Sequence, residues 1–351
     1  MSGQAQGLPL PACPDMVVVQ CLSPERPLPA MIIVLVNEDG KTTRAAEIDP
    51  SWLQPGSPVI FWADIAQPEP RSRELLAGLF RFHELSVEDA LSEAHHPKIE
   101  SYDHYLYLIL HGMAAERNSH GFVTQDVDFF LGANYLVTIR QQESRSIEQQ
   151  QAICERHGSV LAEGPASLLH RIVDLMVDHY RPEVDALEDR LEDLERIVFE
   201  EPASNPLRAI LLLKRDVSSL RRVTLPQRDA LGRLARREFP EIPDQLAYRF
   251  RDIYDNLVRL NDDAISFQDR VTGLLDAYLS SQSNRLNQVM KVLTVIATIF
   301  MPLTVISSMW GVNVPLPGFP GPPGAQFWWV TGIMLAISAV MLWVFRLMRW
   351  L

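Results

Sequence analysis

The sequence predicts an α+β membrane protein with an N-terminal α/β domain, a long helical region and two C-terminal transmembrane helices. Three observations lead to this prediction. The first 165 residues contain short runs of β-branched and aromatic residues between turn signals. From about residue 166 the apolar residues recur at helical spacing. Near the C-terminus, two apolar runs without charge are each long enough to cross most of a bilayer.

The N-terminal part is expected to form a flexible lead over residues 1–15 and an α/β domain over residues 16–165. Val, Ile, Tyr and Phe suit the half-buried surface of a sheet, so runs rich in them favour strands. We expect helices at residues 73–82 and 87–93, and the strand order stays open. The predicted strands are residues 17–21, 31–36, 59–62, 104–110, 126–131 and 135–140.

Residues 166–243 are predicted to form an acidic helical hairpin with a turn at 201–206. Its first helix has a heptad-like seam, and its second begins at Leu207 and ends near Glu238. The many Asp and Glu residues of the first helix form either the solvated face of a coiled-coil pair or a surface that gathers cations. The seam residues are Leu187, Leu191, Leu194 and Val198.

A single helix is predicted for residues 244–309, because no proline lies between Asp244 and Pro302. At 1.5 Å per residue it would be roughly 98 Å long, far more than a bilayer requires. Its first part must therefore project from the membrane as a stalk. Within the span, Pro302 frees a backbone carbonyl, and we expect the hydroxyl of Thr298 to compensate.

One face of this predicted helix mixes hydroxyl, amide and small residues with Met and Leu. Its members follow each other at steps of three or four residues. Polar groups are costly in hydrocarbon unless they face protein or water. The face is thus either a pore wall with apolar constrictions or a surface for helix packing. Its members are Asp276, Leu279, Ser283, Asn287, Met290, Leu293, Ala297, Met301, Thr304 and Ser308.

The charge distribution predicts the topology. The formal net charge is -12, and all 44 acidic residues precede Ala277. An acidic soluble part argues against nucleic-acid binding and for the attraction of cations, although many soluble domains are acidic for solubility alone. Lys and Arg flank both spans, so we expect both termini in the cytoplasm, the loop 310–326 outside, a second span at 327–347 and a cytoplasmic tail at 348–351. The flanking residues are Arg285, Lys291, Arg346 and Arg349.

The stretch NQVMKVLTVIATIFMPLTVISSMWGVN, with its loop and short second span, resembles the first transmembrane helix and signature loop of the CorA family of divalent-cation transporters. The family pattern is Gly-Met-Asn, and Gly311-Val312-Asn313 has the form found in the ZntB-like zinc-transporting branch. The resemblance is close over residues 241–351 and loose over the acidic part before them. It implies a homopentamer in the bacterial inner membrane, with the first span of each subunit lining an axial path.

The resemblance also implies roles for the striped face. Asn313 would present a ring of amide oxygens to a hydrated cation at the outer mouth, and Gly311 would permit the turn. Lower on the axis, hydroxyl and amide rings would alternate with apolar constrictions that stop ions by dewetting. Asp276 would form a carboxylate ring at the inner exit, or else a salt bridge on the stalk. The polar rings are Thr304, Ser308 and Asn287, and the constrictions are Met290, Leu293 and Met301.

Two acids match the positions at which magnesium-transporting members place a regulatory metal site between subunits, Asp89 and Asp252. Alternatively, Ser86 and Asp89 form a capping box at a helix start. Six of the nine histidines lie between His83 and His120 without metal-ligand spacing, and we expect them at the surface.

These features predict zinc uptake through an axial path. Proton coupling would need a titrating group outside the membrane, Asp276 or Lys291, because neither span holds a carboxylate or a histidine. The alternatives are a Mg²⁺, Co²⁺ or Ni²⁺ channel gated by cytoplasmic metal, and a non-conducting coiled-coil scaffold or sensor. No enzyme activity and no cofactor besides the divalent cation are expected, since no phosphate loop or nucleophile motif occurs.

Overall fold

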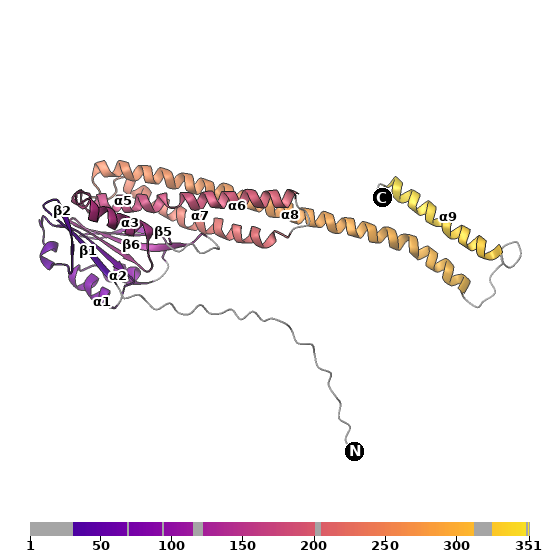
Figure 1. Cartoon of the computed structure of the whole chain (residues 1–351), viewed down its shortest axis with the longest axis horizontal. Coiled ribbons are helices and arrows are strands. Elements are labelled where there is room, and N and C mark those ends of the chain that lie inside the picture. Colours follow the sequence, from indigo (N-terminus) through magenta and orange to yellow (C-terminus); the bar gives the residue numbers. More distant parts are fainter. Residues whose placement is uncertain are drawn as a thin grey trace, which may run out of the picture. The chain divides into compact units, whose positions relative to one another are not determined.

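The structure is a computed structural model of the chain, and it describes residues 31–68, 70–92, 95–114, 122–200, 205–311, 325–348 and 350 (Figure 1). The predicted lead at 1–15 and the predicted strand at 17–21 lie outside the described residues. The chain divides into two compact units. The first comprises residues 1–117, 124–177 and 229–253, and the second comprises residues 118–123, 178–228 and 254–351.

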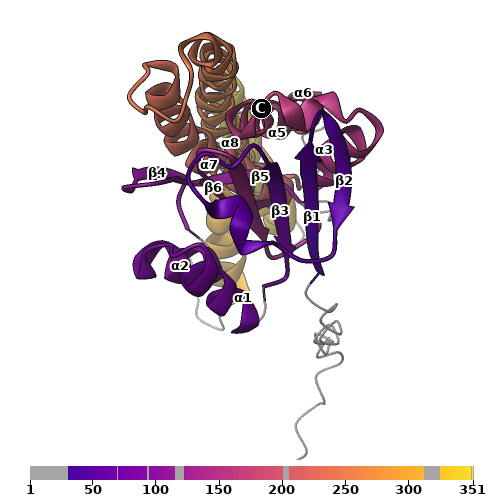
Figure 2. The ribbon, with the colours of Figure 1, turned by 90° about the vertical axis from the view of Figure 1, so that its left-hand side faces the viewer.

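The first unit is built on one seven-stranded sheet with the order β2-β1-β3-β7-β6-β5-β4 (Figure 2). Neighbouring strands are antiparallel except β3 and β7, which are parallel. Helices cover both faces, α1 and α2 on one side and α3 and α5 on the other. The strands are β1 (Met31–Glu38), β2 (Lys41–Ala45), β3 (Ile60–Ala66), β4 (Lys98–Ser101), β5 (Leu106–Met113), β6 (Thr124–Leu131) and β7 (Tyr135–Arg140).

The centre of the sheet is buried on both faces, and every residue of β7 is buried. An aromatic cluster fastens the segment after α1 to the sheet: the ring of Phe82 stacks on that of Phe130 with centroids 4.2 Å apart. The helices of this unit are α1 (Pro70–Glu74), which continues as a π-helical turn (Leu75–Leu79), α2 (Glu84–Leu91), α3 (Arg145–Arg156), α4 (Ser159–Ala162) and α5 (Pro165–Asp178), with a 3-10 turn at Pro50–Leu53.

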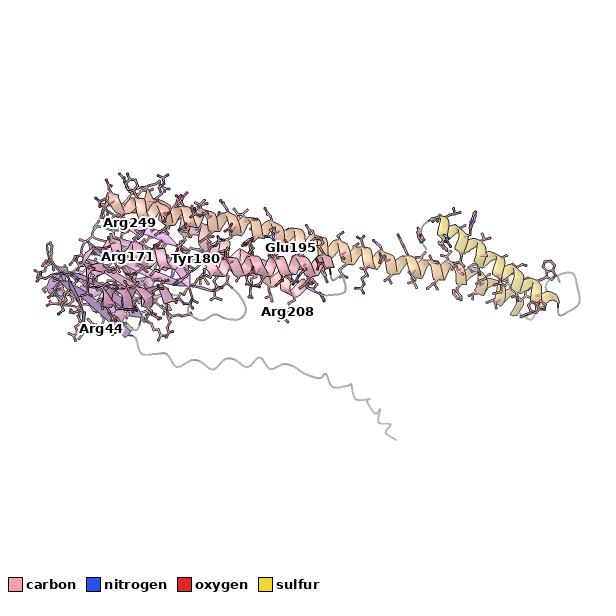
Figure 3. The ribbon with its side chains drawn as sticks, turned by 45° about the horizontal axis from the view of Figure 1, so that its top comes forward. Arg44, Arg171, Tyr180, Glu195, Arg208 and Arg249 are labelled. Carbon is pink, nitrogen blue, oxygen red and sulfur yellow. The ribbon has the colours of Figure 1, made fainter. Side chains whose placement is uncertain are left out.

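The second unit is helical. It contains α6 (Arg181–Glu200), most of α7 (Leu207–Ala235), α8 (Asp244–Gly311) from residue 254 onward, and α9 (Ala325–Leu347). The four seam residues of α6 are all buried. Glu195 of α6, labelled in Figure 3, accepts a hydrogen bond of 3.0 Å from Arg270 of α8. Arg190 of α6 donates to buried Asp216 of α7 at 2.8 Å.

Helix α8 has 68 residues and continues without a break through Pro302. Helices α8 and α9 each contain a stretch long and apolar enough to cross a membrane. The long continuous helix and the two C-terminal apolar helices are therefore confirmed. The helices α7 and α8 also contribute their residues 229–235 and 244–253 to the first unit.

Candidate ion path and cytoplasmic carboxylates

The nine predicted pore-lining residues are all exposed on α8 in the single subunit. Even the large apolar members lie open: Met290 is 57 %, Leu293 58 % and Met301 74 % exposed. An apolar stripe of this length on a described helix needs a partner surface, either lipid or other protein. The other members are Asp276, Ser283, Asn287, Ala297, Thr304 and Ser308.

Only a narrow strip of α8 within the span is covered, and it lies away from the stripe; other apolar residues off the stripe, such as Val292 at 61 %, are exposed as well. Val295 is only 7 % exposed, and Ile299 and Ile306 are half-buried. At 3.6 residues per turn these positions lie on the far side of the helix from Met301. Helix α9 runs back beside this part of α8 in Figure 1, and its Phe345 is buried. The second apolar helix thus leaves the striped face free.

Three threonine hydroxyls in the apolar part of α8 donate hydrogen bonds to the helix backbone. The hydroxyl of Thr304 donates to the carbonyl of Phe300 at 2.8 Å, and that of Thr294 donates to the carbonyl of Met290 at 2.7 Å. A threonine whose proton is committed to the backbone has only its oxygen lone pairs to offer outward. Such oxygens accept hydrogen bonds from the water shell of a cation.

The expected compensation of Pro302 by Thr298 is wrong. The hydroxyl of Thr298 donates to the carbonyl of Thr294 at 2.7 Å. It therefore points toward the previous turn, whereas the carbonyl that Pro302 frees is that of Thr298 itself. A threonine in a helix reaches the carbonyl four residues before it more readily than its own.

At the outer end, α8 ends with Gly311, whose Cα has open space around it. Val312 and Asn313 of the predicted signature lie outside the described residues. At the inner end, Asp276 is exposed and forms no ion pair with any other described residue. Among the described residues of one subunit, the alternative salt bridge on the stalk is therefore not formed.

Asp89 lies at the end of α2, where its carboxylate pairs with Lys98 of β4 at 2.6 Å and approaches His95 at 3.6 Å. Lys98 also pairs with Glu100 at 2.9 Å. Partial burial opposes the charge on Lys98, but the hydrogen bonds that it donates to Asp89 and Glu100 outweigh this effect and raise the pKa of the amine. The carboxylate of Asp89 is therefore already paired with a cation, the ammonium group of Lys98 in the same chain.

The capping-box interpretation of Ser86 and Asp89 is wrong. Helix α2 begins at Glu84, and the ring of His83 caps it by accepting a hydrogen bond from the amide of Leu85 at 3.2 Å. Ser86 is buried instead, and its hydroxyl lies 2.7 Å from the phenol oxygen of Tyr105. A histidine in the cap position escaped notice because Ser, Thr, Asp and Asn are the usual caps.

Asp252, the second acid of the predicted regulatory site, is an exposed residue of α8. Within the described residues, no three His, Cys, Asp or Glu side chains gather to hold a metal ion. Three of the predicted surface histidines are exposed, His83, His96 and His104. His111 differs, because it is largely covered and lies 3.4 Å from Asp126.

A buried acid beside this region was missed by sequence reasoning. Asp128 of β6 is buried and accepts a hydrogen bond of 2.5 Å from the hydroxyl of Tyr107 on β5. Burial raises the pKa of Asp128 to about 8, although the Tyr107 hydrogen bond and the charge of Lys98 work against that rise. Alternation along β6 would have placed Asp126 and Asp128 on one face of the sheet, which is the signal that was available.

Comparison with known proteins identifies the family of the chain. Residues 58–347 match the family described as CorA-like Mg2+ transporter protein. The chain is 32 % identical over 277 residues to the cobalt/magnesium transport protein CorA of Thermotoga maritima, covering 78 % of each chain. It is 24 % identical over 291 residues to the zinc transport protein ZntB of Yersinia pseudotuberculosis, covering 83 % of this chain and 88 % of that one.

Solved structures show the same fold. The complete CorA magnesium transporter from Methanocaldococcus jannaschii superposes with a TM-score of 0.76 at 22 % identity, over 90 % of this chain and 97 % of that one. The full-length CmaX protein superposes with a TM-score of 0.74 at 22 % identity, over 92 % and 98 %. The match over residues 58–347 and the 32 % identity establish that the chain belongs to the CorA-like family of divalent metal ion transporters.

Proposed function

We propose that the chain assembles as a homopentamer in the bacterial inner membrane, with both termini in the cytoplasm, and carries divalent cations along an axis lined by the striped face of α8. The observation that carries this proposal is the position of α9. It covers the strip of α8 that includes Val295, and the stripe around Met301 and Thr304 stays open. A stripe with hydroxyl and amide groups is costly against lipid and favourable around water.

One subunit has too few spans to enclose a path. Identical copies around an axis convert each exposed stripe residue into a ring, and closed cyclic symmetry satisfies every copy equally. In this arrangement Thr304 and Ser308 form hydroxyl rings, and Met301, Leu293 and Met290 form apolar constrictions. Asp276 forms a ring of carboxylates at the inner exit.

The path contacts the cation with neutral oxygens. Neither apolar run holds Asp, Glu, His or Cys. Such a lining favours passage of a cation that keeps much of its water, because hydroxyl and amide oxygens accept hydrogen bonds from that water. At the outer mouth, the amide of Asn313 is proposed to do the same, with Gly311 and Val312 shaping the turn. Protons that accompany the cation would titrate outside the spans, at Asp276 or Lys291.

Zinc is the first candidate cation, because Gly311-Val312-Asn313 has the form of the ZntB-like branch. A second candidate pair is Mg²⁺ and Co²⁺. The identity of 32 % to a cobalt/magnesium transport protein exceeds the 24 % to a zinc transport protein. The oxygen-only path also suits magnesium, which keeps its waters, better than zinc, which prefers nitrogen and sulfur ligands.

Two threonines of one span provide a matched test. Both Thr304 and Thr298 donate to the carbonyl one turn before, at 2.8 and 2.7 Å, but Thr304 is exposed on the stripe and Thr298 is half-buried beside it. In reconstituted vesicles, Thr304→Val removes a ring of acceptors and lowers divalent flux about fivefold. Thr298→Val makes the same chemical change off the axis and leaves the flux unchanged. Equal effects of the two variants would contradict the axial path.

The signature residue and the cation are tested in the same vesicles. Asn313→Ala abolishes uptake without changing the size of the assembly. Zinc, magnesium and cobalt flux are compared with and without a proton gradient. Zinc flux that exceeds magnesium flux supports the first candidate, and the reverse supports the second. A non-conducting scaffold would show no uptake of any of the three.

A further inference from the structure

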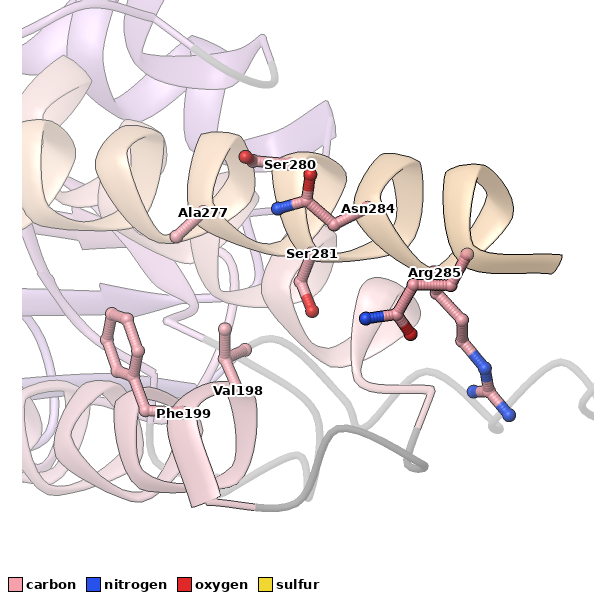
Figure 4. Close-up of a pocket in the computed structure, with 8 residues that line it drawn as sticks. Val198, Phe199, Ala277, Ser280, Ser281, Asn284 and Arg285 are labelled. Atoms are coloured by element: carbon pink, nitrogen blue, oxygen red, sulfur yellow. The ribbon is translucent and has the colours of Figure 1, made fainter. Parts of the chain in front are cut away.

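The two helices of the hairpin, α6 and α7, each leave an apolar surface exposed near the turn between them. Phe199, in the last turn of α6, is 71 % exposed. In Figure 4 its ring extends from α6 toward α8, but a pocket of about 750 Å³ lies between the end of α6 and Ala277 of α8. At the start of α7, Leu207 and Leu211 line another pocket of about 360 Å³, and Leu211 is 49 % exposed. Among the described residues of one subunit, both surfaces therefore stay largely uncovered.

The contact between α6 and α7 fixes where these two surfaces lie. Arg190 of α6 donates to Asp216 of α7 at 2.8 Å, and α7 runs back along α6 (Figure 1). Phe199 follows Arg190 by nine residues, and Leu207 precedes Asp216 by nine. Nine residues make about two and a half helical turns and about 13.5 Å. Phe199 therefore lies on the side of α6 away from α7, Leu207 lies on the side of α7 away from α6, and both are at the same height.

A pair of opposite charges has the same relationship. Glu192 follows Arg190 by two residues, and Lys214 precedes Asp216 by two, so they too are at one height and on the outer sides of their helices. Both are exposed, and neither forms an ion pair with another described residue. Helix α6 has eight acidic and three basic residues, whereas α7 has two acidic and seven basic residues. The two helices are therefore complementary in charge.

In the proposed pentamer, α6 and α7 lie behind α8 as seen from the axis. Arg270 of α8 donates a hydrogen bond to α6, and Gln268 of α8 accepts one from α7. Around the helix, buried Val271 and Leu274 lie between these two contacts, and exposed Asp276 of the stripe lies on the other side. Helices α6 and α7 thus flank the back of each α8, and α6 of one copy comes next to α7 of the following copy.

The dimensions of such a ring bring these two helices into contact. Five α8 helices packed about 10 Å apart have their axes about 8.5 Å from the centre of the ring. The α6 and α7 helices behind them lie about 17 Å from the centre, where ten helices are about 11 Å apart. A rotation about the axis changes no height. Phe199 of one copy therefore meets Leu207 and Leu211 of the next, and Glu192 likewise meets Lys214.

We propose that this contact joins the hairpins of neighbouring copies: the ring of Phe199 packs against Leu207 and Leu211 of the next copy, beside an ion pair of Glu192 with Lys214. Each copy supplies one aromatic ring and receives one, so the interface is heterologous and closes around the axis. The inference rests on the homopentamer of the proposed function, but it does not depend on which cation is transported.

The test is a disulfide between copies of the full chain, in a background whose three native cysteines are replaced by alanine. Helix axes about 11 Å apart place facing Cα atoms about 6 Å apart, which a disulfide can span. Under mild oxidation, Phe199→Cys with Leu211→Cys gives a ladder of crosslinked chains. Phe199→Cys with Arg222→Cys, about 16 Å farther along α7, gives about tenfold less crosslinking. Equal crosslinking in the two variants, or none in the first, overturns the proposal.

Assembly and flux separate this inference from the proposed function. A variant that is a pentamer by native mass spectrometry and conducts, yet forms no ladder, overturns this contact alone. A chain that forms no pentamer overturns the proposed function and the contact with it. If the cysteine variants fail to assemble, benzoylphenylalanine in place of Phe199 is activated by light. It crosslinks to α7 of a second copy, and crosslinking to lipid or only within one chain overturns the contact.

The charged pair gives an independent measurement. Glu192→Lys places two cations opposite each other and lowers the temperature at which the pentamer dissociates, and adding Lys214→Glu restores that temperature. The charge of Glu192 also raises the pKa of Arg270 in its own copy, so the restoration, and not the loss, identifies the contact. As a matched control, Arg222→Glu adds the same kind of charge at another height and restores nothing. Failure of Lys214→Glu to restore, or equal restoration by Arg222→Glu, overturns the ion pair.

Discussion

The carboxylate of Asp64 on β3 and the guanidinium of Arg140 on β7 form an ion pair of 3.1 Å inside the first unit, and both side chains are buried. Thr138 and Gln151 donate to the same carboxylate at 2.7 and 2.9 Å. The pair therefore crosses the parallel junction of the sheet, where β3 and β7 meet. The carboxylate of Asp64 therefore has hydrogen-bond donors from both β7 and α3.

We expect Arg140→Leu to lower the free energy of unfolding by about 3 to 5 kcal/mol, because it leaves the Asp64 charge buried without its partner. Thermal unfolding of the full chain measures this loss. Arg196→Gln breaks an exposed pair with Asp193 of 2.8 Å and costs less than about 1 kcal/mol. Similar shifts for both variants would show that the buried pair contributes no more than a surface pair.

Asp128 predicts a pH dependence of stability. Its pKa in the folded state, about 8, lies above the ordinary value of 3.8, so the folded state binds the extra proton. The stabilising effect of that proton is complete below pH 4 and is lost as the pH rises through 8. Asp128→Asn stays neutral and can still accept from Tyr107, so it raises the melting temperature at pH 8.5 and leaves it unchanged near pH 4. A melting temperature that responds equally at both pH values would contradict this assignment.

Lys98 limits how a divalent cation could bind at the predicted metal site of Asp89 and Asp252. Its amine pairs with the carboxylate of Asp89 at 2.6 Å, so a divalent cation would have to displace it for Asp89 and Asp252 of neighbouring subunits to share that cation as predicted. Lys98→Met removes the competitor, and Mn²⁺ then raises the melting temperature at about tenfold lower concentration. The double variant Lys98→Met, Asp89→Asn loses this response. If Mn²⁺ still raises the melting temperature of the double variant at the lower concentration, the cation binds at a site other than Asp89.

In the proposed pentamer, Met301 is expected to form the constriction that most resists ions. Its side chain is 74 % exposed on the stripe, and a ring of such thioethers would exclude water. Met301→Ser wets the ring and raises basal divalent flux several-fold, measured in reconstituted vesicles. Val340→Ser introduces a hydroxyl on an exposed position of α9 and leaves the flux unchanged. A flux that Met301→Ser leaves unaltered would remove Met301 from the set of constrictions.

Much of the helical part was predictable from the sequence because its signals are long. The seam of α6 repeats over three turns, and the absence of proline before Pro302 defines α8. Two strands were missed, β2 and β4, which lie at the two edges of the sheet. Edge strands are short and partly exposed, so they carry Lys and Arg in place of an alternating apolar pattern.

The candidate site could be predicted only where its residues recur at a regular spacing along the sequence. The stripe on α8 follows from helical spacing, and its role as the lining of a path stays a prediction. The partner of Asp89 was not predictable, because Lys98 is brought to it by the folding of β4 against β5, and no local pattern encodes that contact. The pairing of Asp128 with Tyr107 depends in the same way on the register of β5 and β6.

The unbroken course of α8 has a mechanical consequence. Its first residues, 244–253, belong to the first compact unit, and its last residue, Gly311, ends the first span. A rod of 68 residues is about 100 Å long. A tilt of a few degrees at its base therefore sweeps the far end sideways by several ångströms, about the diameter of a hydrated ion. In the proposed pentamer, a small rearrangement around residues 244–253 would by this leverage change the bore at the Gly311 end of α8.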